Sequence, residues 1–128
     1  DSLHTAKTRY TTKVHDASKK IPKEQFEKHS KFYFQPSSVN IQPWHFLIAE
    51  TDEAKQRIAS AQTGNYIYNA AKVLNSSHTL VFCTRTDISA NKGLKASVIV
   101  SLGYRSENDF NAKLPKSRLS DEVVFTRL

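Results

Sequence analysis

The chain has little cysteine and little glycine, and each shortage excludes a class of protein. Cys83 is the only cysteine, so no disulfide can form within the chain and a reducing compartment is expected. The three glycines lie far apart, which excludes a P-loop and a dinucleotide-binding glycine fingerprint. No run approaches the roughly 18 apolar residues of a membrane-spanning helix. The N-terminus lacks the apolar core of a signal peptide, and we therefore expect a cytoplasmic protein without a membrane partner.

Metal ligands and clustered charge are also scarce. The histidines show no close pairing and Cys83 has no second thiol, so we expect no metal site. The net charge of +7 favours anionic partners, namely a phosphate-bearing cofactor, nucleic acid or an acidic membrane surface. No run of Lys or Arg exceeds two residues, and the aromatic residues are not interleaved with basic ones as stacking platforms usually are. Nucleic acid is therefore not the expected partner.

The length of 128 residues allows one domain with one core. Hydrophobic residues make up 38% of the chain, which is below the usual share of about 45–50% in globular proteins. The domain is therefore either small and rich in surface, or it depends on apolar surface that lies outside this sequence.

Helices are expected in four places. They cover residues 2–9, residues 22–34, the stretch from Thr51 to Gly64, and residues 66–75. Pro22 suits the first turn of the second helix, and Thr51 can cap the third, which Gly64 can end. The inward face of the second helix is expected at Phe26, His29, Ser30, Tyr33 and Phe34.

Short apolar runs predict the strands. These runs cover residues 44–49, 80–84 and 96–102, and residues 123–126 form a predicted final strand. The second and third runs are β-branched and continuous, which is typical of strands buried on both faces. The sequence thus indicates an α/β or α+β layout. Such a sheet needs more apolar helix than this chain supplies.

Four polar clusters remain as candidates for a site. They are Arg9-Tyr10-Thr11-Thr12-Lys13, the loop of residues 36–44, Asn65-Tyr66-Ile67-Tyr68-Asn69 with Lys72, and Leu114-Pro115-Lys116-Ser117-Arg118. Taken singly, each is more often a set of solvated charges, a turn, a capped helix or a basic tail. Composition alone predicts only a soluble basic α/β domain.

Together, however, these segments resemble the enterobacterial oxygen-insensitive nitroreductases, a family that also includes enzymes described as dihydropteridine reductases and related flavin reductases. The most specific block is Pro36-Ser37-Ser38-Val39-Asn40-Ile41-Gln42-Pro43-Trp44-His45-Phe46, followed by the Leu-Pro-Lys-Ser-Arg tail. The four segments occur in the family's order. The resemblance implies an α+β fold, a nitroreductase-like three-layer sandwich in which a mixed sheet is flanked by helices, with residues 1–128 forming a single domain.

The resemblance also implies an FMN cofactor. In the family, positions matching Arg9, Lys116 and Arg118 hold the phosphate, as charge-assisted hydrogen bonds favour. The position matching Lys13 approaches the ring edge and stabilises the reduced, anionic flavin. The remaining implied cofactor-binding residues are Tyr10, Thr11, Asn69, Lys72 and, from the other subunit of a homodimer, Pro36, Ser37, Ser38 and Asn40.

The implied reaction is ping-pong electron transfer from NAD(P)H, as co-substrate, to small-molecule acceptors such as nitroaromatics, quinones or pterin-like compounds. The chemistry belongs to the cofactor, so no side chain need act as a nucleophile. The sequence also shows no dedicated acid.

The chain departs from the family near residues 85–92. Family members continue there into a long helical section that supplies the central dimer helices and a Pro-x-Glu-Gly stretch over the flavin ring, which this sequence lacks. We expect that the sequence omits segments of a longer protein; the competing explanation is a truly shortened chain. The alternative function, from a different class, is a non-catalytic basic binding domain, either for nucleic acid or as a degenerate flavin-fold remnant.

Overall fold

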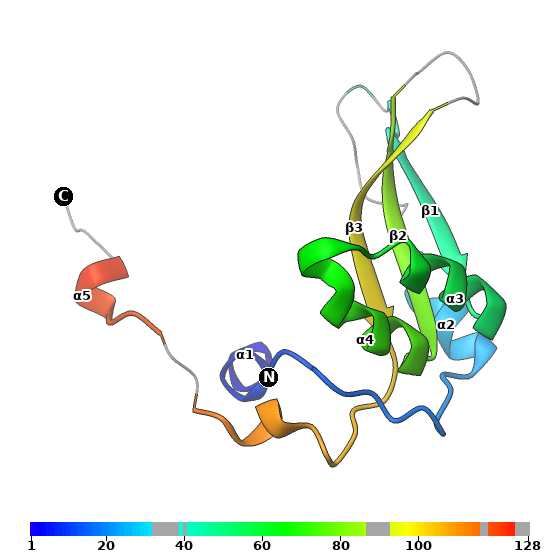
Figure 1. Ribbon diagram of the computed structural model, residues 1–128. Coiled ribbons are helices and arrows are strands. Elements are labelled where there is room, and N and C mark those ends of the chain that lie inside the picture. The colour runs from blue at the N-terminus through cyan, green and yellow to red at the C-terminus, as the bar shows by residue number, and fades with distance from the viewer. Residues whose placement is uncertain (32–38, 40, 87–92, 116–117, 125–128) are drawn as a thin grey trace.

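A three-stranded antiparallel sheet forms the centre of the molecule in the computed structural model (Figure 1). The structure describes residues 1–31, 39, 41–86, 93–115 and 118–124. The strands are β1 (Trp44–Ala49), β2 (His78–Arg85) and β3 (Leu94–Leu102), in the order β1-β2-β3. The expected α+β layout is confirmed, and the described strands are all antiparallel, whereas a mixed sheet was expected.

The central strand β2 contributes more buried residues than any other described element. Leu80, Val81 and Cys83 are buried, because β2 has a neighbouring strand on each side and helices near both faces. Phe46 of β1 meets Phe82 of β2 edge to face, with ring centroids 5.2 Å apart. The buried thiol of Cys83 therefore acts as a small apolar group within the sheet.

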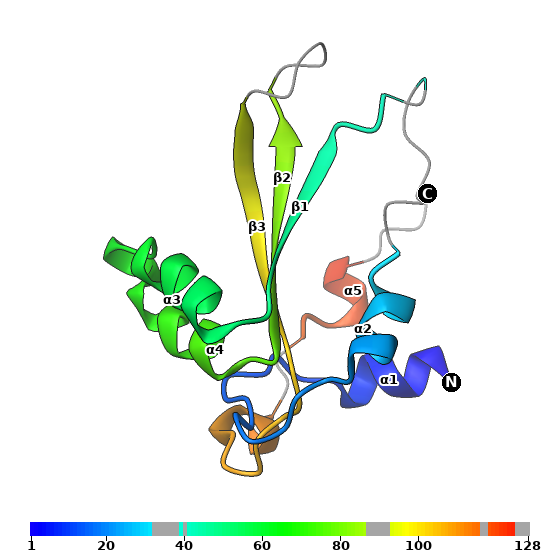
Figure 2. The same ribbon diagram turned by 90° about the vertical axis from the view of Figure 1, so that its right-hand side faces the viewer.

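Helices lie on both sides of the sheet but cover only one end of it (Figure 2). On one side are α3 (Asp52–Ser60) and α4 (Ala70–Asn75), which pack against each other, and on the other side is α2 (Lys23–His29). Phe26 of α2 is buried and stacks on the His78 ring, with centroids 4.1 Å apart. The far ends of the strands extend beyond these helices.

The inner face of α3 includes a lysine, which the apolar pattern of this helix does not predict. Thr51 caps the helix as expected, with its hydroxyl oxygen accepting from the Ala54 N–H at 3.2 Å. Lys55 is only 1% exposed. Its ammonium donates to the carbonyl oxygens of Leu74 and Ser76, each at 3.1 Å, and lies 3.1 Å from the Asp52 carboxylate. Lys55 thus caps the C-terminal end of α4.

Several predicted elements differ from the structure. The helix predicted over residues 22–34 covers only Lys23–His29; within its predicted inward face His29 is exposed, Ser30 is half-buried, and Tyr33 and Phe34 lie outside the described residues. The third helix ends at Ser60 rather than at Gly64, whose positive φ of 59° instead begins the 3-10 helix η3 (Gly64–Asn69). The fourth predicted helix corresponds to η3 followed by α4.

The strand predictions fail in two respects. The β3 strand is not buried on both faces: its first six residues are exposed and its last three half-buried, because the helices cover only the end of the sheet at which Leu102 pairs with His78 (Figure 2). The strand predicted over residues 123–126 is also wrong at Val123 and Val124, since Asp121–Val124 forms a helical turn, α5, and residues 125 and 126 lie outside the described residues. Val123 and Val124 are exposed there, so their β propensity finds no neighbouring strand to pair with.

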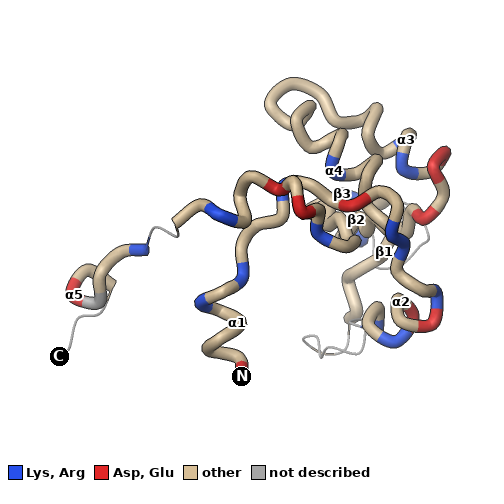
Figure 3. The backbone as a smooth tube through the Cα atoms, turned by 90° about the horizontal axis from the view of Figure 1, so that it is seen from below, with Lys and Arg blue, Asp and Glu red and all other residues tan. Residues whose placement is uncertain are grey.

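The first and last described helices lie away from the sheet (Figure 1). The first helix, α1 (Ser2–Thr8), buries none of its residues, and α5 lies further out still (Figure 1). The described basic residues are spread over several elements, including α1, α2, α3 and the C-terminal segment, and do not gather on one face (Figure 3). Within the described residues, no helix is both long and apolar enough to cross a membrane.

Candidate functional site

Two segments from opposite ends of the chain lie side by side next to the sheet. Residues 14–16 run antiparallel to residues 104–106, with an isolated bridge between His15 and Arg105. The Asp16 N–H donates to the Tyr104 carbonyl at 2.8 Å, and the Ser106 N–H donates to the Val14 carbonyl at 3.0 Å. The guanidinium of Arg105 lies 4.3 Å from the centre of the Tyr10 ring, within cation–π range.

Asp109 joins the same two segments through its side chain. Its Oδ2 accepts from the N–H groups of Lys13, at 2.7 Å, and Val14, at 3.0 Å, while its Oδ1 accepts from the Asn111 N–H at 2.9 Å. The residue is 2% exposed. Burial alone would raise the pKa of this carboxyl group, but the three backbone hydrogen bonds outweigh burial and lower the pKa below its ordinary value.

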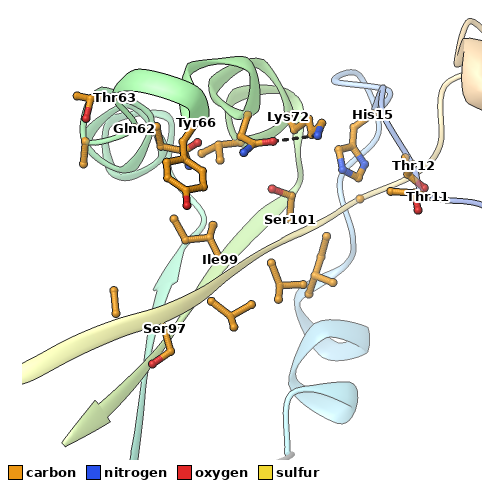
Figure 4. A pocket seen from close by; sticks show the side chains of 18 of the residues that line it. Thr11, Thr12, His15, Gln62, Thr63, Tyr66, Lys72, Ser97, Ile99 and Ser101 are labelled. Carbon is orange, nitrogen blue, oxygen red and sulfur yellow. Dashed lines mark hydrogen bonds between the residues drawn. The ribbon is translucent and has the colours of Figure 1, made fainter. Parts of the chain in front are cut away.

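The larger of two cavities in this region lies between β3, η3, α4 and the N-terminal segment. It has a volume of about 910 Å³, in the range of small-molecule and cofactor sites. Its polar walls carry Asn69 and Lys72, whose ammonium donates to the Asn69 side-chain oxygen at 2.9 Å (Figure 4). Thr11 and His15 line the cavity from the N-terminal segment, with His15 near Lys72, and Ile99 lines it from β3.

The smaller cavity lies between the N-terminal segment and the C-terminal segment and has a volume of about 280 Å³. It is lined by Arg9, Tyr10, Thr11, Asn111, Leu114, Pro115 and Arg118. Thr11 lines both cavities, so the two open on either side of one residue. A small space with two guanidinium groups is suited to a phosphate.

Two buried polar atoms on residues that line the larger cavity lack a hydrogen-bond partner within the described part of the chain. They are Oε1 of Gln62 and Nδ1 of His15. A buried polar atom without a hydrogen-bond partner lowers the free energy of unfolding by about 1–3 kcal/mol, so such atoms are uncommon in folded proteins. Together with the paired guanidinium groups in the smaller cavity, they fit a polar ligand that also carries an anionic group.

The sequence matches the profile of the nitroreductase family over residues 6–119. The chain belongs to the nitroreductase family.

The family's members include close relatives in sequence. The chain is 45% identical over 87 residues to the oxygen-insensitive NAD(P)H nitroreductase of Enterobacter cloacae. The matched region covers 67% of this chain and 40% of that protein. It is 32% identical over 84 residues to the major NAD(P)H-flavin oxidoreductase of Aliivibrio fischeri, covering 65% of this chain and 38% of that protein. The chain thus spans about 40% of the length of the curated relatives it matches.

Solved structures show the same fold. A protein of Exiguobacterium sibiricum, described as a nitroreductase in complex with FMN, superposes with a TM-score of 0.55 at 29% identity, covering 66% of this chain and 39% of that one. An iodotyrosine deiodinase bound to FMN and 3-iodo-L-tyrosine superposes with a TM-score of 0.62 over 92% of this chain and 96% of that one. At 17% identity, the second comparison shows the fold alone. The predicted nitroreductase-like fold is confirmed.

The structure separates the predicted site residues of this nitroreductase-family chain into four groups, and Thr11 belongs to two of them. Arg9, Tyr10, Thr11 and Arg118 meet at the smaller cavity, and Thr11, Asn69 and Lys72 line the larger one. Lys13 lines neither cavity, although its N–H is fixed by Asp109. The other predicted residues, Pro36, Ser37, Ser38, Asn40 and Lys116, lie outside the described residues.

Sequence reasoning missed four residues that shape the site of this nitroreductase-family protein: His15, Arg105, Asp109 and Asn111. Their contacts join positions about 90 to 100 apart in sequence, which no local pattern reveals. His15 is nearly buried, and burial, assisted by nearby Lys72, lowers its pKa against the opposing effects of the Tyr104 backbone and Asp109. Gly103 packs against this ring: a Cβ there would lie 3.1 Å from His15 Nδ1.

Proposed function

We propose that this protein is an FMN-dependent oxidoreductase that takes electrons from NAD(P)H and passes them to nitroaromatics, quinones or pterin-like acceptors. The observation that carries the proposal is the pair of cavities that meet at Thr11, one small and lined by two guanidinium groups, the other large and lined by amide, hydroxyl and ammonium groups. The cationic small cavity suits a phosphate group and the larger cavity suits a polar aromatic ring, so the pair matches a molecule with a phosphate at one end and such a ring at the other.

The smaller cavity is the proposed phosphate site. Arg9 and Arg118 can each donate charge-assisted hydrogen bonds to a phosphate dianion. Asn111 and Tyr10 line the same space and add neutral polar groups. Lys116 would supply a third cation from the same C-terminal segment.

The larger cavity is the proposed ring site. The Asn69 side chain is held by Lys72, so its amide is fixed in one orientation at the cavity wall. Lys72 brings positive charge to the same wall, and Lys13 follows two residues after Thr11 in the chain. These cations would stabilise negative charge on a reduced ring through electrostatic attraction. Ile99 and Tyr66 provide apolar surface on the cavity wall and would limit the access of water.

FMN, when bound, supplies the electron transfer itself: it accepts two electrons from NAD(P)H and gives them to the acceptor in alternating half-reactions. The protein's residues bind the phosphate, orient the ring and favour its reduced charge. Within this proposal no side chain forms a covalent bond to substrate.

The protein is further proposed to act as a homodimer, in which residues 36–40 of one subunit pack on the flavin of the other. Apolar side chains on both outer strands support an interface: Leu47, Ile48, Val98 and Ile99 are all exposed in the single chain. A monomeric soluble protein rarely exposes a large contiguous apolar surface.

The test is to separate the two half-reactions under anaerobic conditions. We expect NADPH or NADH alone to bleach the visible flavin absorbance of the FMN-loaded protein, and a nitroaromatic or quinone added afterwards to restore it. Initial rates with both substrates varied should give parallel double-reciprocal lines. Loaded protein whose absorbance stays unchanged with both nicotinamides would overturn the proposed activity.

A further inference from the structure

We propose that Asp109 and Asn111 are positioning residues that set the geometry of the flavin-binding segment, residues 9–14. The inference rests on the proposed function, because it concerns how the same two cavities are held in shape. Neither residue needs to touch the reacting atoms, and Asp109 lines neither cavity.

The flavin-binding segment has no regular secondary structure of its own to hold it. It follows α1, none of whose residues are buried, so α1 offers no packed anchor. Yet Arg9, Tyr10 and Thr11 line the smaller cavity, and Thr11 and Thr12 line the larger one. The placement of these walls therefore depends on tertiary ties to the rest of the protein.

The closest of those ties come from Asp109 and Asn111. Asn111 donates from its side-chain nitrogen to the Thr11 carbonyl at 2.6 Å, across 100 positions of sequence. Asp109 accepts hydrogen bonds from the backbone N–H groups of Lys13, at 2.7 Å, and Val14, at 3.0 Å. Thr11, which lines both cavities, is thus held directly by Asn111, and Lys13, two residues further along the chain, is held by Asp109.

A carboxylate is specifically suited to the position of Asp109. Consecutive backbone N–H groups that converge on one point form a concave site for an anion, and here Asp109 Oδ2 occupies it. The second oxygen accepts from the Asn111 N–H at 2.9 Å, which fixes the start of the short 3-10 helix η4 (Phe110–Lys113). An asparagine has only one acceptor oxygen, so it can satisfy one side of this arrangement and not both.

The same carboxylate links the two ends of the proposed phosphate site. Asp109 holds the backbone of Lys13 and Val14 in the N-terminal segment and that of Asn111 in the C-terminal segment. Arg9 belongs to the first of these segments and Arg118 to the second, and both line the smaller cavity. Loss of the carboxylate should therefore separate the two guanidinium groups more than it disturbs the ring cavity, whose other walls come from α4 and β3.

The experiment compares Asp109→Asn with Asp16→Asn. Asp16→Asn is a matched control because it makes the same change of charge on the same side of the protein, while Asp16 bonds only to Ser18 and Lys19 through its side chain. Dissociation constants are measured for FMN and for riboflavin, which lacks the phosphate. We expect Asp109→Asn to weaken FMN binding about tenfold and riboflavin binding much less, so that the affinity ratio falls, and Asp16→Asn to leave the ratio unchanged.

Hydrogen exchange gives a second readout that does not depend on the cofactor. In Asp109→Asn, the amides of Lys13 and Val14 should exchange about tenfold faster, while the amides of β2 keep their protection. Retained protection in β2 shows that the variant folds. Asn111→Ala removes the bond to the Thr11 carbonyl and also a polar side chain from the wall of the smaller cavity, and it should change the FMN-to-riboflavin ratio in the same direction by a smaller factor.

The outcomes separate this inference from the proposed function. Wild-type protein that binds neither flavin overturns the proposed function and this inference with it. Wild-type protein that binds FMN, with an unchanged FMN-to-riboflavin ratio in both variants or unchanged exchange at Lys13 and Val14, overturns the inference alone. A uniform loss of protection throughout β2 in Asp109→Asn, with an unchanged ratio in Asn111→Ala, would give Asp109 a purely structural role and would also overturn it.

Discussion

The cations of this chain differ in what surrounds them, and those surroundings indicate what each can do. Arg9 and Arg118 line a small cavity, Lys72 bonds an amide at the wall of a larger one, and Lys55 is enclosed by backbone carbonyls. Side chains such as Lys7 and Arg57 are exposed. Of these environments, the first two are open to a ligand, and their cations Arg9, Arg118 and Lys72 are the ones that line the proposed flavin site.

Replacing Arg9 should therefore weaken FMN binding through the phosphate. We expect Arg9→Gln to raise the dissociation constant for FMN about tenfold, the value of one charge-assisted hydrogen bond, and to leave riboflavin binding nearly unchanged. Lys7→Gln, which makes the same change of charge on exposed α1, serves as the control. Flavin fluorescence titrations measure both constants. Equal effects of the two substitutions would place the phosphate elsewhere.

Buried titratable residues predict how stability depends on pH. Burial lowers the pKa of His15 and of His78, and three backbone hydrogen bonds, against the effect of burial, lower that of Asp109. In each case the unfolded state binds the proton more readily than the folded state. The stabilisation is therefore complete above the ordinary value, 6.5 for histidine and 3.8 for aspartate, and is lost as the pH falls toward the lowered pKa.

Urea unfolding followed by circular dichroism should show that stability falls with pH in two stages, one for the histidines and one for Asp109. We expect the free energy of unfolding to decrease from pH 7.5 to pH 5.5, and to decrease again below about pH 4. His78→Gln should reduce the first decrease, since it removes one of the two histidines. A wild-type protein equally stable at pH 7.5 and pH 5.5 would contradict the assignment of neutral, buried histidines.

At the level of elements, α3 and α4 are joined by the ammonium group of a single buried lysine. Lys55 satisfies two carbonyl oxygens at the C-terminal end of α4, and Lys20 approaches one of them, that of Ser76, at 3.4 Å. These carbonyls have no partner within the helix that could replace the lysine. The contact matters for the site because α4 and the adjoining η3 form one wall of the larger cavity.

We expect Lys55→Met to lower the free energy of unfolding by about 2–3 kcal/mol. Methionine keeps most of the aliphatic stem, but it leaves the Leu74 carbonyl without its lysine donor and the Ser76 carbonyl with only the longer bond from Lys20. Arg57→Met, on the exposed face of the same helix, should change the free energy by less than about 0.5 kcal/mol. Chemical unfolding measures both values, and similar effects at the two positions would show that the buried ammonium contributes little.

The elements also show which parts of the fold a sequence can predict. Strand β1 and the cap of α3 at Thr51 are set by local patterns, namely an apolar run after Pro43 and a hydroxyl before an acidic first turn. The exposure of β3 and the helical turn at Val123 depend on which neighbours are present, and a short apolar run in the sequence does not contain that information. Lys55 is buried only because α4 ends beside it.

The site follows the same division. Its cations and amides were found through a family resemblance carried by short motifs, and the structure brings Arg9 and Arg118 to one cavity. Asp109 and Asn111 were not predicted as site residues because their partners lie about 100 positions away in the sequence. An aspartate that caps a short helix also has an adequate local explanation. Long-range hydrogen bonds to backbone groups leave no periodic signature in the sequence.

For the whole molecule, the main feature is a sheet whose outer strands are only partly covered. Ile48 of β1 and Val98 of β3 are each 51% exposed. They lie on the same face, because their partners on β2, Leu80 and Phe82, are two positions apart. Both side chains remain exposed in the single chain, although Ile48 lies close to the start of α3.

This surface predicts self-association. We expect sedimentation analysis to show a concentration-dependent mass, and the double substitution Ile48→Thr with Val98→Thr to weaken association roughly tenfold by removing apolar surface while keeping β-branched side chains. Leu3→Thr, at an exposed position of α1, is the matched control. A monomer at all concentrations, or an equal effect of the control, would show that this face is not the contact.

The account as a whole depends on whether these residues bind flavin. The most direct measurement is a titration of the purified protein with FMN, followed by the visible absorption spectrum after removal of free cofactor. The account predicts a yellow protein that retains one FMN per chain and binds riboflavin more weakly. A colourless protein that cannot be reconstituted with FMN would contradict it and would favour a non-catalytic basic domain with the nitroreductase fold.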